Sequence, residues 1–268
     1  MKKVFSFMAV AAMLFVGFSC NPESNDPQKP DDGKDPEPEP EPTEYVAKIA
    51  VDGDFADWAA LPAGSFSKTY GDEEATHPAL THCKVYADAQ YIFVYIEWDT
   101  DIVEADPGDI NNLDEYGDPT GLELVPFHVY INTDGSDATG GFSDQFSDAN
   151  IDVLLEGFLY EVDEPGVSMK IASYEPSAFA WNGDVNGKGW TWADLGGVTC
   201  AGAGIDGKYE LSIKRDDLKE LGQPVADEFS IGFDIQLAWD SVGILPNAAP
   251  SEDNAAGVLA SLKVTTQK

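Results

Sequence analysis

From Tyr45 onward the chain alternates short apolar and polar runs that are separated by turn-forming residues. Apolar residues at every second position, rich in Val, Ile, Tyr and Phe, are typical of strands with one buried face. The predicted strands are Val46–Val51, Thr81–Tyr86, Tyr91–Trp98, Glu123–Ile131, Ile151–Tyr160, Val167–Tyr174, Lys208–Ile213, Phe229–Ala238 and Ala256–Val264. A short helix is predicted over Arg215–Leu221. Because many short strands with little helix are typical of sandwiches and barrels, we expect residues 45–268 to form one all-β, antiparallel β-sandwich.

The connections between these strands differ in length. Asp88-Ala89-Gln90 is short enough to close a tight hairpin. Two other connections, Asp99–Gly121 and Asp240–Ala255, are longer than a sandwich requires, and the first is rich in acidic residues. Long loops on a rigid scaffold often carry binding residues, but they also tolerate insertions that have no function. The sequence leaves both interpretations open.

The first residues have the pattern of an export signal. Lys2 and Lys3 precede the apolar run Val4–Phe18, which is too short to span a bilayer comfortably. The end of that run, Gly17-Phe18-Ser19-Cys20, is similar to the lipobox of bacterial lipoproteins, although Phe18 stands where a small residue is usual. The resemblance implies a signal peptide over residues 1–19 and acylation of Cys20. We therefore expect an exported protein that is lipid-anchored to the outer membrane at the cell surface; the alternative is an ordinary signal peptide.

Residues 20–44 have the composition of a spacer. They are nearly all Pro, Glu, Asp, Asn and Lys, and they include the alternating run from Pro36 to Pro42. Such a segment cannot bury enough apolar surface to offset the entropy of folding, so we expect a disordered acidic linker. Alternating proline and repelling carboxylates favour an extended chain, which would hold the folded part away from the membrane.

Composition and charge narrow the function. The chain has 268 residues, with 49 Asp and Glu against 15 Lys and Arg, which gives a net charge of -34. This charge counts against nucleic acid or an anionic membrane surface as a partner, so contact with a membrane is expected through the lipid anchor alone. The sequence contains no nucleophile-elbow, zinc-protease, phosphate-loop or paired-cysteine motif, and paired acids would occur by chance in so acidic a chain. We expect a protein that is not an enzyme.

Four segments, taken in order, resemble the family 9 carbohydrate-binding modules and their DOMON-like relatives. These segments are Ile49–Trp58, with Asp-Gly and a closing Asp-Trp; Lys84–Asp99; Val129–Gly140, with Asn-Thr-Asp-Gly and a closing Thr-Gly; and Tyr209–Leu218, which begins Tyr-Glu. Asn132 stands where that family commonly has an aspartate, and Lys214 where it commonly has a proline. The resemblance implies a jelly-roll-like sandwich and, in many members, binding of a sugar. It does not fix the ligand, because the wider family includes haem-binding and structural domains.

The tryptophans are the candidates for a sugar-binding platform, since the C–H-rich faces of sugar rings lie against flat aromatic rings. Trp58 is expected in the core, as in the resembling family, and Trp98 shares the apolar face of its strand. Trp181, Trp190 and Trp192 lie in a Gly- and Asn-rich stretch, and the last two would project from one face of a strand. The candidate carbohydrate-binding residues are Trp181, Trp190, Trp192 and Trp239.

A second group of candidates is acidic. Asn132, Asp134, Asp137 and Asp144 supply several oxygen atoms near one turn, and calcium takes six to eight oxygen ligands. The spacing is not that of an EF-hand, because Asp137 occupies the position of its glycine. The resemblance implies that calcium, where it is bound, has a structural role.

The remaining metal and sulfur candidates are few. Cys83 and Cys200 could form one disulfide or could be two small buried side chains. His77, His82 and His128 could form a zinc site, but histidines of a surface or a core fit the pattern better. Haem binding through a methionine ligand would depend on Met169, the one methionine after the signal segment.

The function we expect is non-catalytic binding of a glycan. The alternatives are a structural or adhesion protein with an unknown protein partner and, less favoured, a haem domain.

Overall fold

The computed structural model describes residues 45–61, the backbone of 67–70, and residues 75–248 and 256–268. The predicted signal peptide, Cys20 and the linker lie outside the described residues. Residues 46–268 form one compact unit. No helix in the described ranges is long and apolar enough to cross a membrane.

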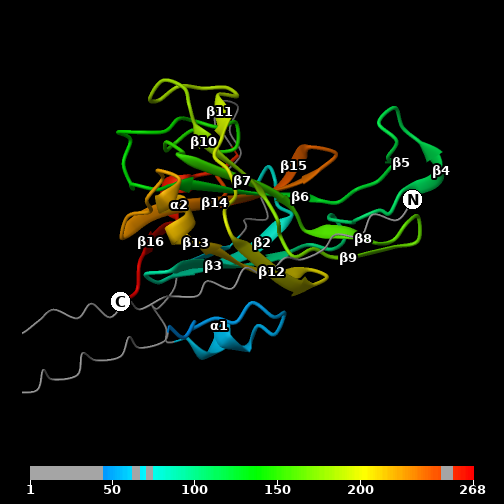
Figure 1. Ribbon diagram of the computed structural model, residues 1–268, viewed down its shortest axis with the longest axis horizontal. Coiled ribbons are helices and arrows are strands. Elements are labelled where there is room, and N and C mark those ends of the chain that lie inside the picture. The colour runs from blue at the N-terminus through cyan, green and yellow to red at the C-terminus, as the bar shows by residue number, and fades with distance from the viewer. Residues whose placement is uncertain (1–44, 62–66, 71–74, 249–255) are drawn as a thin grey trace, which may run out of the picture. The chain divides into compact units, whose positions relative to one another are not determined.

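Two antiparallel sheets form the body of the protein (Figure 1). Sheet A has the strand order β1 (Ser67–Tyr70), β2 (Leu80–Ala87), β3 (Tyr91–Trp98), β13 (Lys208–Lys214) and β12 (Cys200–Ile205). Sheet B has the order β11 (Trp192–Asp194), β10 (Ser177–Trp181), β7 (Val153–Phe158), β6 (Pro126–Asn132), β14 (Glu228–Leu237) and β15 (Asp240–Leu245), with β16 (Lys263–Thr265) also paired to β14. The all-β antiparallel sandwich that the sequence predicts is confirmed.

In the described part of the chain, two hairpins and three short helical segments accompany the sheets. One hairpin pairs β4 (Asp109–Leu113) with β5 (Pro119–Thr120), and the other pairs β8 (Tyr160–Glu164) with β9 (Ser168–Ile171). Both hairpins lie at the same end of the protein (Figure 1). The helical segments are α1 (Ala56–Ala60), α2 (Arg215–Glu220) and the 3-10 turn η1 (Leu259–Ser261).

The main core lies between the two sheets and follows the alternation in the sequence. On β3, Ile92, Val94, Ile96 and Trp98 point into this core, as predicted. On β6 of the facing sheet, Phe127, Val129 and Ile131 do the same. Successive residues of a strand point to opposite faces, so the residues between them lie on the outer faces of the sheets.

Each outer face carries a smaller apolar cluster of its own. The segment with α1 covers the outer face of sheet A, where Ile49 and Trp58 pack with Tyr86, Phe93 and Tyr95. On the outer face of sheet B, Tyr130 and Leu154 pack with Phe146, Ile151, Ile244 and Leu259. Trp58 is therefore buried, as predicted, but it lies in an outer layer and not between the sheets.

Several predicted boundaries are wrong, and each error has a local cause. Val46–Val51 is not a strand; this segment lies across sheet A, where Ile49 packs with Trp58. Ile151–Tyr160 is divided between β7 and β8, because Leu159 leaves the ladder and its N–H donates to the carbonyl oxygen of Val125. Most of Ala256–Val264 forms η1 and adjoining turns, and β16 is short.

Candidate functional site

A cleft of about 460 Å³ lies on the outer face of sheet B. Its floor consists of side chains from three neighbouring strands: His128 and Tyr130 of β6, Leu154 and Glu156 of β7, and Gln236 of β14. Its walls come from residues 142–145, from Gly189, Trp190 and Trp192, and from Trp239. The alternation that sends Phe127 and Val129 into the main core leaves His128 and Tyr130 facing this cleft.

Trp190 and Trp192 both line the cleft, but they do not project from one strand. Strand β11 begins at Trp192, and Trp190 lies in the bend before it. The indole of Trp190 is 67% exposed and meets the ring of Phe179 edge to face, with 6.2 Å between centroids. Trp192 is partly buried against the cluster around Phe146. The two rings therefore belong to one site, although the strand geometry expected of them is wrong.

Trp181 is not among the residues that line the cleft. Its ring packs edge to face against Trp192, with 5.3 Å between centroids, and its indole N–H donates to the carbonyl oxygen of Asp184 at 3.0 Å. Gly141 makes room for it, since a Cβ atom there would lie 2.2 Å from the indole. Trp181 thus supports Trp192 from the side and does not face the cleft itself.

Trp239 lines the cleft from the turn between β14 and β15. Leu237 pairs with Asp240, so the turn has two residues, Ala238 and Trp239, at φ 47° and φ 69°. Turns of this type favour Asn and Gly, because a positive φ strains other residues. The N–H of Ala238 donates to Glu123 Oε2 at 2.7 Å, which helps to hold the turn. The strained turn presents an indole that is 64% exposed, beside the rings of His128 and Phe158.

The long connection predicted over Asp240–Ala255 begins instead with a strand, β15 (Asp240–Leu245). Trp239, which directly precedes the predicted loop, therefore lies at the tip of a hairpin. Residues 249–255 of the predicted loop lie outside the described residues. In the other predicted loop, β4 and β5 form a hairpin.

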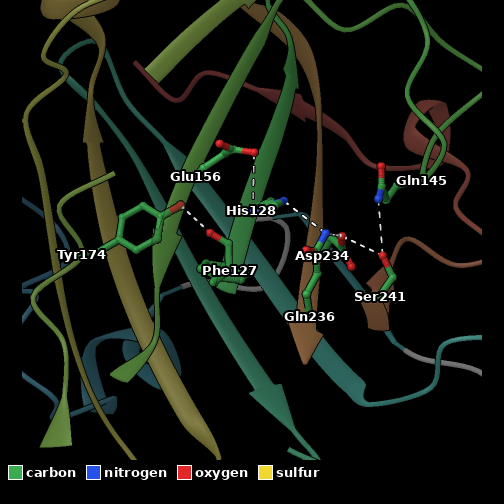
Figure 2. A network of polar contacts seen from close by, with 8 residues as sticks. All are labelled: Phe127, His128, Gln145, Glu156, Tyr174, Asp234, Gln236 and Ser241. Atoms are coloured by element: carbon green, nitrogen blue, oxygen red, sulfur yellow. Dashed lines mark hydrogen bonds and ion pairs between the residues drawn. The ribbon is translucent and has the colours of Figure 1, made fainter. Parts of the chain in front are cut away.

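A chain of polar contacts links side chains of the cleft floor to Asp234 and Ser241 (Figure 2). The amide nitrogen of Gln236 donates to Asp234 Oδ2 at 2.6 Å and lies 3.4 Å from His128 Nδ1. Ser241 also donates to Asp234 Oδ2, at 2.9 Å. Because an amide nitrogen can only donate, His128 Nδ1 must accept, and the neutral ring then carries its proton on Nε2. Nε2 lies 3.8 Å from Glu156 Oε1, which is too far for a hydrogen bond.

Burial shifts the pKa values of the ionisable side chains at and beside this floor. Removal from water disfavours charge, so burial lowers the pKa of His128 to about 4 and raises that of Asp234 to about 7. The hydrogen bonds that Asp234 accepts from Gln236 and Ser241 oppose its shift. Burial also raises the pKa of Glu156. At neutral pH His128 is therefore uncharged, can donate a hydrogen bond through Nε2, and does not neutralise the charge of Glu156.

Several polar groups at the floor have no protein partner. Tyr130 is 3% exposed and His128 is 4% exposed, and both line the cleft. Within the described residues, His128 Nε2 is buried without a hydrogen bond, and neither the Tyr130 hydroxyl nor the Glu156 carboxylate makes one. Buried polar groups usually have partners, and partnerless groups beside exposed aromatic rings are typical of a ligand site.

We expect Asp234→Asn to change how stability depends on pH. A carboxyl group whose pKa is raised on folding contributes its full stability below the unfolded pKa, and this contribution is lost as pH rises through the folded value of about 7. Asparagine keeps the shape of the Asp234 side chain but cannot ionise. From pH 5 to pH 8 the wild-type protein should lose on the order of 2 kcal/mol relative to the variant, measured by denaturant unfolding. If the free energy of unfolding of the two proteins depended on pH in the same way, the raised pKa of Asp234 would be contradicted.

The predicted calcium ligands are divided between the turn after β6 and the cleft. Asn132 Oδ1 accepts from the N–H of Gly135, and Asp134 accepts from the N–H of Ser136 and from the Thr139 hydroxyl, so these oxygens already hold the turn. Asp137 is exposed, and Asp144 lines the cleft instead. Among the described side chains, no group of three or more His, Cys, Asp or Glu could hold a metal ion. Asp144 therefore belongs to the cleft and the other three residues to the turn, and calcium binding stays a prediction.

No disulfide joins Cys83 and Cys200. They lie on β2 and β12, and two other strands separate these within sheet A. At about 4.8 Å per strand the two residues are at least ~14 Å apart, whereas the Cα atoms of a disulfide lie within about 7 Å. Met169 packs against the main core, whereas His128 lies on the outer face of sheet B, so these two residues do not form a pair of haem ligands.

The floor of the cleft is what the sequence did not reveal. Tyr130, Glu156 and Gln236 lie within strands whose alternating apolar residues predict the main core, and that alternation carries no information about a site on the opposite face. The one available signal was His128, which alternates with Phe127 and Val129 on a predicted strand. Comparison with the models of known protein families finds no match, and comparison with curated proteins finds none either.

Proposed function

We propose that the cleft on sheet B binds a carbohydrate without cleaving it. The observation that carries the proposal is the meeting of three indoles from separate segments, those of Trp190, Trp192 and Trp239, over a floor with partnerless polar groups. Flat rings stack on the C–H faces of sugars, while a few polar groups fix the orientation of the ligand. The cleft volume of about 460 Å³ is in the range of small-ligand sites, which runs from about 300 to 1,000 Å³.

The resemblance to family 9 carbohydrate-binding modules and DOMON-like domains supports the same function. Two of its segments meet in the fold: the carboxylate of Glu210 accepts from the N–H groups of Asp52 and Gly53 and from the indole of Trp58. As part of the proposal, the protein is exported and anchored by lipid at Cys20, and residues 20–44 extend the sandwich from the outer membrane toward glycans at the cell surface.

We expect Trp190→Ala and Trp239→Ala each to weaken glycan binding by about 1 to 3 kcal/mol, or roughly 5- to 150-fold. These two indoles are mostly exposed, so their loss removes stacking area from the cleft without opening the core. A glycan array followed by titration calorimetry on the full-length protein would measure the effect. Trp192 is a poorer test, since it is partly buried and its loss would also affect stability.

The matched control is Tyr116→Ala, because Tyr116 is 83% exposed and is not among the residues of the cleft. This variant should bind glycan as the wild type does. Unchanged affinity in both tryptophan variants would remove the cleft as the platform. New reducing ends after prolonged incubation with the bound glycan would contradict a role without cleavage.

A second candidate function rests on the β4–β5 hairpin. Ile110, Leu113 and Tyr116 are exposed there, and exposed apolar side chains on a projecting element favour contact with a protein partner. If adhesion were the function, a triple substitution of these residues by serine would abolish partner binding and leave glycan binding unaffected. The concave, aromatic-lined cleft favours the carbohydrate.

A further inference from the structure

We infer that the cleft selects saccharides without negative charge, and that Glu156 is the residue that sets this selectivity. The inference rests on the proposed function and names the class of its ligand. Among the described residues, those that line the cleft include two carboxylates, those of Asp144 and Glu156, and neither lysine nor arginine. A third carboxyl group, that of Asp234, is buried beside the floor residue Gln236 and accepts a hydrogen bond from it.

The charge of Glu156 has no counter-ion in the described part of the chain. The nearest candidate is His128, 3.8 Å away, which the hydrogen bond from Gln236 and its burial keep neutral at pH 7. Lys188 precedes the lining residue Gly189, but its own side chain is not part of the lining. A half-buried carboxylate beneath a cleft repels an anionic group more strongly than an exposed one does, because water screens it less.

The same floor suits a hydroxyl group, which can accept one hydrogen bond and donate another. The proton on His128 Nε2 and the hydroxyl of Tyr130 are donors without partners, and Glu156 is an acceptor without one. A sugar hydroxyl that reaches the floor can donate to Glu156 and accept from one of the two donors. The carboxylate of a uronate, or the sulfate group of a sulfate ester, offers acceptors alone at that position, and its charge would lie against Glu156.

The test compares chemically matched ligands. Cello- and manno-oligosaccharides and their C6-oxidised counterparts, in which the primary hydroxyl groups are carboxylates, would be titrated against the full-length protein at pH 7.5. We expect the neutral form of a binding oligosaccharide to bind at least tenfold more tightly than its oxidised form. In Glu156→Gln, which keeps the shape and removes the charge, this preference should fall at least threefold.

The control is Glu228→Gln, which makes the same change in net charge at an exposed position that is not part of the cleft. It should leave the preference unchanged, and so separate the local charge from the general repulsion of an acidic protein. Circular dichroism would check that each variant is folded; if Glu156→Gln is not, Asp144→Asn in the exposed wall replaces it.

The outcomes distinguish the two proposals. An oxidised oligosaccharide that binds as well as or better than its neutral form would overturn the selectivity and leave carbohydrate binding intact. A preference that is the same in wild type and in the folded Glu156→Gln or Asp144→Asn variant would overturn the role of these carboxylates. Binding of neither form, with no other glycan bound on an array, would overturn the proposed function and this inference with it.

Discussion

Arg215→Ala is expected to lower the free energy of unfolding by about 3 to 4 kcal/mol, because it leaves several buried acceptors without a donor. The Arg215 guanidinium is buried and donates to the carbonyl oxygens of Asp88, Val225 and Ala226 and to the hydroxyl of Thr266. It thereby connects the β2–β3 turn, the segment after α2 and the C-terminal end of the chain. Chemical denaturation with tryptophan fluorescence would measure the loss.

The matched control is Lys219→Ala, which removes a cation from the exposed side of the same helix. It should change stability by less than about 0.5 kcal/mol, as surface substitutions usually do. Equal effects of the two substitutions would show that the buried hydrogen bonds of Arg215 contribute nothing beyond its charge. Burial lowers the pKa of Arg215, but arginine stays protonated at any pH at which the protein would be studied.

Glu210→Ala is expected to cost about 2 to 4 kcal/mol and to loosen the layer that covers the outer face of sheet A. One oxygen of Glu210 accepts from the N–H groups of Asp52 and Gly53, at 3.0 and 2.8 Å, and the other accepts from the Trp58 indole at 2.9 Å. Without the carboxylate these three donors are left without their acceptor. Hydrogen exchange should therefore rise at Asp52, Gly53 and Trp58 more than in the strands of sheet B.

A conservative variant sharpens this prediction. Glu210→Gln keeps one carbonyl oxygen, but its NH2 group would face either the Trp58 indole or the two backbone N–H groups, all of which are donors. It should lie between wild type and alanine in stability. If Glu210→Ala destabilised the protein without faster exchange at residues 52–58, the carboxylate would not be what holds this layer in place.

The sequence predicted the strands along which apolar and polar residues alternate, namely β2, β3, β6, β7, β9, β13 and β14, and it missed β1, β4, β5, β10, β11 and β15. Strand β3 has the same bounds as its prediction, Tyr91–Trp98. Helix α2 ends one residue earlier than predicted, at Glu220. Strand β12 was missed, since its sequence from Cys200 to Ile205 is rich in glycine and alanine, which have low strand propensity. The structure explains this composition: a Cβ atom on Gly202 would lie 1.8 Å from the Tyr209 hydroxyl. Close packing across β12 and β13 therefore favoured glycine over a strand-forming residue.

The candidate site likewise combines features that the sequence indicated with features that only the structure shows. The sequence by itself determined that the protein has an alternating all-β core, and it offered Trp181, Trp190, Trp192 and Trp239 only as candidates, because period-two burial and composition are local properties. Only the tertiary structure decided that Trp190, Trp192 and Trp239 line one cleft and that Trp181 does not. It also placed His128 beside Glu156 and Gln236, since β6 lies between β7 and β14 in sheet B. Pairing between strands distant in sequence sets these contacts, and no local pattern encodes it.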